Sequence, residues 1–201
     1  MSRRAARMTA DDRRAQLIDV TLPLLREHGR ATTTKQIAEA AGIAEGTIFR
    51  AFETKDELFL CALEKAFDPT DLIERTEAID LSLPLRERMV AAVTLLSERF
   101  TSMFTLMSRM GMLQPPRARR HTEELRARGL AAIEALLAPD ADAFRVDVPQ
   151  VAHTLRLLTF SGSHPHITEG RLLSPDQIVD VVLHGTLAPV PAQTTPTQTE
   201  K

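Results

Sequence analysis

The sequence of 201 residues contains no tryptophan, no tyrosine, one cysteine and eight glycines. Cys61 alone cannot form an intramolecular disulfide, and it leaves no cysteine cluster for zinc. No run of about 18 apolar residues occurs, so we expect no membrane span. The N-terminus also lacks an apolar core segment, so we expect no secretory signal and a cytoplasmic protein.

Motifs for the common kinds of catalysis are also missing. The sequence has no glycine-rich phosphate loop, no nucleophile elbow and no paired-acid motif. His164 and His166 are closely spaced but have no cysteine or acid beside them, so we predict neither a metal site nor a cofactor. Cys61 lies among apolar residues, which favours a small buried side chain over a redox sensor. We expect the protein not to be an enzyme.

Residues that favour helices are abundant, namely alanine, leucine, arginine and glutamate. No apolar–polar alternation of strand length occurs, so the pattern predicts an all-α protein. The formal net charge is −2, which argues mildly against DNA binding because nucleic-acid binders often carry a large positive charge. However, Arg3, Arg4 and Arg7 have no acid among them. Such an arm is either a solvated tail or a contact with DNA.

The most informative segment covers residues 32–52 and has the pattern of two short helices around a glycine turn. Thr33 and Gln36 form the pattern of a capping box at the start of the first helix. Gly42 supplies the positive φ that a sharp turn between helices usually needs. Ile48 and Phe52 continue the apolar pattern into a second helix. This layout is typical of a helix-turn-helix that reads DNA, with its motif at about residues 32–51.

The motif and the residues after it resemble the DNA-binding domain of the tetracycline-repressor (TetR) family of bacterial transcriptional regulators. The resemblance rests on Ile37, Ala38, Ala41, Gly42, Ile43, Gly46, Thr47, Ile48, Phe49, Phe52 and the run Lys55-Asp56-Glu57-Leu58. It is strong over roughly residues 9–69, and beyond them only length, helical character and the order of elements agree.

The resemblance implies two helical domains. We expect a three-helix, helix-turn-helix DNA-binding domain at 9–69 and a helical domain for effector binding and dimerisation at 70–188. From residue 189 to residue 201 proline, threonine and glutamine dominate, so we interpret this tail as disordered.

Candidate DNA contacts come from the starts of the predicted helices, because side chains near the N-terminus of a recognition helix reach base edges. They are Thr33, Thr34, Lys35, Glu45, Gly46, Thr47, Phe49, Arg50 and Lys55. Arg50 could bind guanine or phosphate, and the sequence does not decide between them. Glu45 faces repulsion from the phosphates unless it accepts a hydrogen bond from a cytosine amine.

The resemblance implies roles at three further points. Lys55 matches the family's lysine that meets the DNA backbone from the start of the next helix. Phe49 stands where the family usually has a tyrosine whose hydroxyl touches phosphate, so this hydrogen bond is lost. Ala44 stands where a helix-capping serine is common, so we expect this cap to be missing.

The second domain carries two apolar features. Five residues on a long predicted helix line an adaptable apolar pocket or belong to an ordinary core: Phe100, Met103, Phe104, Met107 and Met110. No acid or base interrupts residues 100–108, so a bound effector would be apolar. The last two predicted helices are apolar on many sides, and we expect them to form the dimer interface through Val151, Leu155, Leu158, Ile178 and Val182.

The sequence therefore predicts a homodimeric transcriptional regulator that binds a pseudo-palindromic, double-stranded operator. The resemblance implies a repressor that a small apolar effector releases, although the residues alone do not separate repressor from activator. One alternative is a helical carrier or enzyme with a vestigial DNA-binding domain, which only Glu45 and Phe49 favour. Another is a DNA-binding protein without an effector.

Overall fold

The structure is a computed structural model that describes residues 9–114 and 123–187. This part of the chain is helical, and the β-bridge within it is an isolated antiparallel pairing of Phe144 with Leu187. The predicted all-α class is confirmed. None of the helices in these two ranges combines the length and the apolar character that crossing a membrane requires. The predicted basic arm (Arg3, Arg4 and Arg7) and the tail at 189–201 lie outside the described residues.

The N-terminal elements follow the predicted capping signals. They are α1 (Ala10–His28), the 3-10 segment η1 (Gly29–Ala31), α2 (Thr34–Ala41), the 3-10 segment η2 (Glu45–Thr47), α3 (Ile48–Ala51) and α4 (Lys55–Ala66). Thr9 and Thr33 each form a complete capping box, at the start of α1 and α2. Gly42 ends α2 with a φ of 66°, as predicted for the turn of the motif. Helix α1 continues through Pro23.

The C-terminal elements are also helical. They are α5 (Thr70–Glu77), α6 (Leu85–Met110), α7 (Glu123–Leu137), the 3-10 segment η3 (Ala138–Ala143), α8 (Val148–Gly162) and α9 (Pro175–Thr186). Asp147 caps α8, and Ser174 forms a capping box at α9. Gly111 ends the long helix α6 with a φ of 62°.

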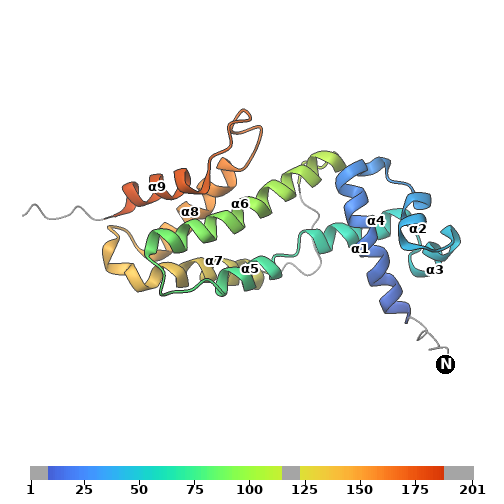
Figure 1. Cartoon of the computed structure of the whole chain (residues 1–201), viewed down its shortest axis with the longest axis horizontal. Helices are drawn as coiled ribbons and strands as arrows, with labels where there is room; N and C mark the ends of the chain where they lie inside the picture. Colours follow the sequence, from blue (N-terminus) through green and yellow to red (C-terminus); the bar gives the residue numbers. More distant parts are fainter. Residues whose placement is uncertain (1–8, 115–122, 188–201) are drawn as a thin grey trace, which may run out of the picture.

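The molecule is elongated, with α1–α4 at one end, α5–α9 at the other and α6 running between them (Figure 1). Each end has its own hydrophobic core. Leu106 and Met110, near the end of α6, are buried in the N-terminal core, whereas Phe100 on the same helix is buried in the C-terminal core. Helix α6 therefore contributes side chains to both cores and joins the two ends of the molecule.

Arginine side chains reinforce this connection at two places. Arg30 Nε donates to the carbonyl oxygen of Met110 at 2.8 Å, at the end of α6. Arg99 on α6 donates to the carbonyl oxygens of Ala66 and Asp68, at the end of α4. These bonds satisfy carbonyls that helix ends leave without an intrahelical partner. They tie α6 to both α1 and α4.

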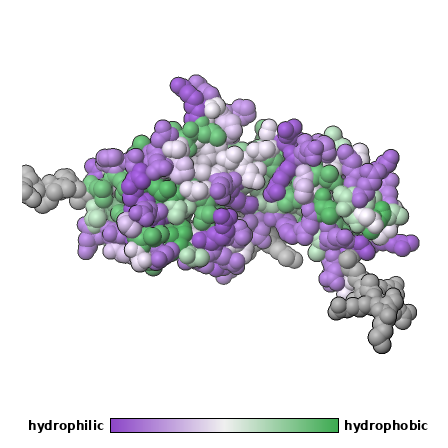
Figure 2. All heavy atoms as spheres, in the orientation of Figure 1, coloured by the Kyte–Doolittle hydropathy of each residue, from purple (hydrophilic) through white to green (hydrophobic). Residues whose placement is uncertain are grey.

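The outer surface of the viewed face is mixed. Hydrophobic residues lie in small groups among hydrophilic ones, and hydrophilic residues predominate around the middle of the molecule (Figure 2). Such dispersed apolar surface is ordinary for folded proteins. Functional inference therefore depends on particular exposed side chains.

Candidate nucleic-acid interface

The recognition segment comprises η2 and α3, residues 45–51. Ala44 precedes it and provides no side-chain cap, so the expected loss of this cap is confirmed. The first turn has the tighter 3-10 form. Ile48 is completely buried and anchors the segment on the N-terminal core. The opposite face presents Glu45, Gly46 and Arg50 to solvent.

Phe49 and Gly46 distinguish this exposed face from an ordinary protein surface. The Phe49 side chain is 50% exposed although it is large and apolar. A Cβ atom added to Gly46 would meet no protein atom within 4 Å, and its φ is not in the left-handed region. The fold therefore does not require glycine at this position. Both observations are consistent with a surface that meets something outside the protein.

The start of α2 lies beside the recognition segment. The Thr34 hydroxyl donates to Oε1 of Glu45 across the turn of the motif. The Thr33 hydroxyl accepts from the backbone N–H of Gln36 at 3.2 Å, so its first role is to cap α2. Lys35 is exposed. The structure thus places Thr34 against Glu45, with Thr33 and Lys35 as its neighbours in the chain.

Lys55 begins α4 and is the only candidate contact outside the motif. Its ammonium group lies 4.9 Å from the centroid of the Phe59 ring, one helical turn further on. Thr54 caps the same helix by accepting from the backbone N–H of Glu57. A cation over an aromatic face is stabilised by the ring quadrupole. Phe59 therefore holds Lys55 at the helix start that the resemblance implies for a phosphate contact.

Arg14 on α1 holds the recognition segment in place from behind. Its guanidinium donates to the carbonyl oxygen of Ala51 and lies 4.0 Å from the centroid of the Phe52 ring. It also forms an ion pair with Glu57 on α4, with 2.6 Å between Nη2 and Oε1. The hydrogen bond from Arg14 keeps the pKa of Glu57 below its ordinary value. One side chain thus links α1, α3 and α4.

The sequence analysis missed Arg14. The run Lys55-Asp56-Glu57-Leu58 drew attention to Glu57, but nothing in the sequence connects it with a residue 43 positions earlier. An amphipathic helix with several arginines does not show which of them meets a partner.

Known proteins match this helical arrangement and this motif. Residues 17–62 match the family model described as bacterial regulatory proteins, tetR family. The N-terminal end of the chain therefore carries a DNA-binding domain of the kind found in TetR-family transcriptional regulators. This family consists of transcriptional regulators and not of enzymes.

The chain is similar in sequence to two curated proteins and in fold to a solved structure. It is 41% identical to the HTH-type transcriptional regulator YvkB of Bacillus subtilis over 64 residues, which are 31% of this chain and 34% of YvkB. It is 43% identical to the HTH-type transcriptional repressor KstR2 of Rhodococcus jostii over 47 residues, which are 23% of each chain. These matches span 34% and 23% of the relatives' own length.

The fold extends further than the sequence similarity. A TetR-family transcriptional regulator from Streptomyces coelicolor superimposes with a TM-score of 0.60 at 22% identity, covering 89% of this chain and 80% of that one. This likeness shows that the arrangement of helices is shared over both ends of the molecule.

The five residues predicted to line an apolar pocket are divided between the two hydrophobic cores in the described part of the chain. Phe100 and Phe104 pack in the C-terminal core, Met107 and Met110 pack in the N-terminal core, and Met103 contacts both. Helix α6 crosses from one core to the other along this stripe, so packing accounts for its apolar character. Of the two interpretations of this stripe, these contacts favour an ordinary core, and the apolar pocket stays a prediction.

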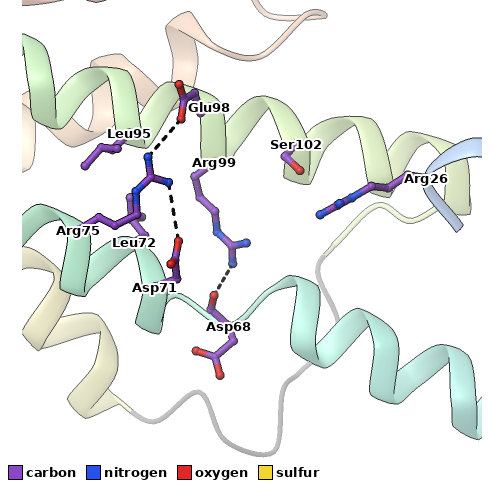
Figure 3. A pocket seen from close by; sticks show the side chains of 9 residues that line it. All are labelled: Arg26, Asp68, Asp71, Leu72, Arg75, Leu95, Glu98, Arg99 and Ser102. Carbon is purple, nitrogen blue, oxygen red and sulfur yellow. Dashed lines mark hydrogen bonds and ion pairs between the residues drawn. The ribbon is translucent and has the colours of Figure 1, made fainter. Parts of the chain in front are cut away.

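A polar cleft lies next to this stripe, between α1, the α4–α5 connection, α5 and α6. Its volume is about 270 Å³. It is lined by Arg26, Asp68, Asp71, Leu72, Arg75, Leu95, Glu98, Arg99 and Ser102. Arg75 Nη1 lies 3.8 Å from Oδ2 of Asp71, and Arg75 Nη2 lies 3.8 Å from Oε2 of Glu98. The side chain of Arg26 on α1 points toward the cleft (Figure 3). Burial lowers the pKa of Arg99, and the positive charge of Arg26 lowers it further.

Most of the predicted dimer contacts lie in the core of a single chain. Four of them, Val151, Leu155, Ile178 and Val182, are buried inside a single chain, and Leu158 packs against the same core. Helices α8 and α9 use these faces to cover α6, because both helices pack on it and on each other. The apolar pattern thus identified faces that pack within one chain, and the dimer interface itself stays a prediction.

Proposed function

We propose that this protein is a TetR-family repressor that binds a pseudo-palindromic operator as a homodimer and is released by a small ligand. The exposed face of the recognition segment carries the proposal. It presents Gly46, Phe49 and Arg50 outward, while Ile48 and the Arg14 clamp fix its backbone. A rigid segment with an unobstructed outer face suits insertion into a major groove.

The dimer is proposed to form through the outer faces of α8 and α9. Leu157 on α8 is 45% exposed and Val181 on α9 is 61% exposed. They lie on different faces of these helices from the buried Leu155 and Val182. Two helices from each protomer would bury these side chains in a four-helix interface. A dimer also supplies the two recognition helices that operator half-sites about 34–36 Å apart demand.

The ligand is proposed to occupy the polar cleft between α1, α5 and α6. The cleft is lined by residues from both ends of the molecule, including Arg26 beside the N-terminal core and Arg75 on α5. Its six charged side chains favour a polar ligand over the apolar one that the sequence suggested. A ligand bound there would contact Arg99, whose guanidinium donates to the carbonyl oxygen of Ala66 at the end of α4. Binding is thereby coupled to the position of the DNA-binding helices.

The decisive experiment measures retention of DNA fragments that flank the gene, by gel shift with the full-length protein. We expect specific retention with a steep dependence on salt, because each phosphate contact adds about 0.9 to the log–log slope. Lys55→Ala should weaken binding to all sequences alike and reduce that slope. Lys65→Ala is a matched control, because Lys65 is on the same helix and pairs with Asp19 away from the recognition segment.

The outcomes separate the alternatives. Equal affinity of the wild type for flanking and unrelated DNA would contradict operator binding and favour a carrier or enzyme with a vestigial domain.

The ligand site is tested with Ser102→Trp, whose larger side chain would fill the cleft from α6. It should keep a reporter gene behind the operator repressed under every condition that induces it with the wild type. Normal induction of this variant would exclude the cleft.

A further inference from the structure

Glu45 is an acid placed where a DNA-binding protein would approach phosphates. We propose that its carboxylate reads a cytosine in each operator half-site and that Thr34 orients it for this contact. This inference rests on the proposed binding of operator DNA. It assigns sequence specificity to an acidic side chain that, by its charge alone, would oppose binding.

The carboxylate is fixed on one side and free on the other. Oε1 accepts the hydrogen bond from the Thr34 hydroxyl. Within the described residues, no further hydrogen bond and no ion pair is recorded for Glu45, and the side chain is exposed. Oε2 is therefore available to a donor outside the protein. Glu45 also begins the recognition segment, the part that reaches base edges in a helix-turn-helix.

Base chemistry in the major groove selects the donor. Cytosine presents its N4 amine there, whereas guanine presents only acceptors and thymine an acceptor and a methyl group. Adenine has an N6 amine, but its N7 acceptor lies directly beside it and would repel a carboxylate. A carboxylate is therefore best matched to cytosine. This contact offsets the repulsion between Glu45 and the phosphates.

Thr34 is a positioning residue in this arrangement. A hydroxyl has one hydrogen to donate, and that of Thr34 is directed at Glu45. It is therefore not available to donate to a DNA phosphate at the same time. Its role is to restrict the rotamers of Glu45, so that less conformational freedom is lost when DNA binds.

The test is selection of binding sites from a randomised duplex library with the full-length protein and with Glu45→Gln. Glutamine keeps an oxygen that can accept from Thr34, but its amide pairs with adenine N6 and N7. We expect the wild type to enrich a motif with one cytosine per half-site. The variant should prefer adenine at that position, with at least a tenfold change in the cytosine-to-adenine affinity ratio, the order of one good base contact.

Three further variants separate recognition of the base from a simple effect of charge. Glu39→Gln removes the same charge from an exposed position on α2, and it should raise affinity for all sequences without altering the motif. Thr34→Val removes the hydroxyl and should broaden the preference at the cytosine position only. Thr34→Ser restores the hydroxyl and should restore the preference.

The results also distinguish failure of this inference from failure of the proposed function. Enrichment of the same motif by the wild type and Glu45→Gln would overturn the cytosine contact while leaving operator binding intact. Enrichment of no motif by the wild type would overturn both. A decisive confirmation uses a half-site whose cytosine analogue lacks the exocyclic amine, which should weaken the wild type and not Glu45→Gln.

Discussion

A Cβ atom added to Gly29 would lie 2.1 Å from the carbonyl oxygen of Arg109, so the ends of α1 and α6 meet backbone to backbone. The hydrogen bond from Arg30 to the carbonyl oxygen of Met110 lies directly beside this contact. Gly29 has a φ of 57° and a ψ of −134°, a conformation that essentially only glycine adopts. The junction between the two cores therefore depends on the absence of a side chain.

Gly29→Ala is accordingly expected to destabilise the protein by about 2–4 kcal/mol, through backbone strain and the clash with Arg109. Urea unfolding followed by circular dichroism measures this loss. Gly129→Ala is the matched control, because Gly129 lies inside α7 and an added Cβ would only touch Ile73 at 3.7 Å. The control should be neutral or stabilising. Equal stability of the two variants would mean that the junction is not tightly packed.

Gly46→Ala, unlike Gly29→Ala, should leave the stability of the protein unchanged or increase it, but it should weaken DNA binding. Alanine meets no protein atom at this position and gains about 0.5–1 kcal/mol of helix preference over glycine. The added methyl group would, however, separate the recognition segment from DNA. Thermal unfolding and a gel shift on the same sample check both halves. Undiminished DNA affinity would show that the backbone at residue 46 does not approach DNA closely.

Acid should loosen the clamp behind the recognition segment. The Arg14 hydrogen bond keeps the pKa of Glu57 below the value of 4.5 that applies to an unperturbed glutamate. The unfolded chain therefore takes up this proton at a higher pH than the folded chain does. The stabilisation is complete above pH 4.5 and is lost as the pH falls through the lowered pKa of the folded state.

The measurement is the unfolding midpoint of wild type and Glu57→Gln at a series of pH values from neutral to about 3. The stability difference between the two should be largest at neutral pH and should shrink below pH 4.5. A constant difference over the whole series would show that the Glu57 charge contributes nothing and that only its shape matters.

Phe49→Tyr should strengthen DNA binding. The ring is half exposed on the recognition segment, and the resemblance places a phosphate-binding hydroxyl at its tip. A neutral hydrogen bond contributes about 0.5–1.5 kcal/mol, so affinity should rise by roughly 2–13-fold. Titration of an operator fragment by fluorescence anisotropy measures the change. Weaker binding would mean that the segment docks in a different orientation from that of its relatives.

Local signals in the sequence predicted local structure well. The predicted capping box at Thr33 and the predicted turn at Gly42 are both present, because each depends on residues within a few positions of one another. Contacts between distant segments left no such signal. The Arg14–Glu57 pair joins α1 and α4, and no short sequence pattern shows how these two helices pack against each other.

The absence of any sequence signal for contacts between distant segments also affects the predicted dimer interface. Residues 178–183 of α9 are apolar on most sides, so hydrophobic periodicity does not reveal which side meets the chain's own core. Only the packing of α9 on α6 and α8 shows that Val182 faces inward and Val181 outward. The polar cleft was likewise invisible, because its lining residues come from α1, α5 and α6.

Neighbouring valines on α9 therefore provide the sharpest test of the dimer. Val181 is 61% exposed and Val182 is 2% exposed, although they are adjacent in the sequence. Val181→Asp should leave the protomer folded but place a charge in the proposed interface, producing monomers with much weaker operator affinity. Val182→Asp should instead bury an unpaired carboxylate in the C-terminal core and destabilise the fold by several kcal/mol. Sedimentation velocity and thermal unfolding of both variants separate the two effects. A wild type that sediments as a monomer at micromolar concentration, or a Val181→Asp variant that remains dimeric, would contradict an interface through the outer faces of α8 and α9.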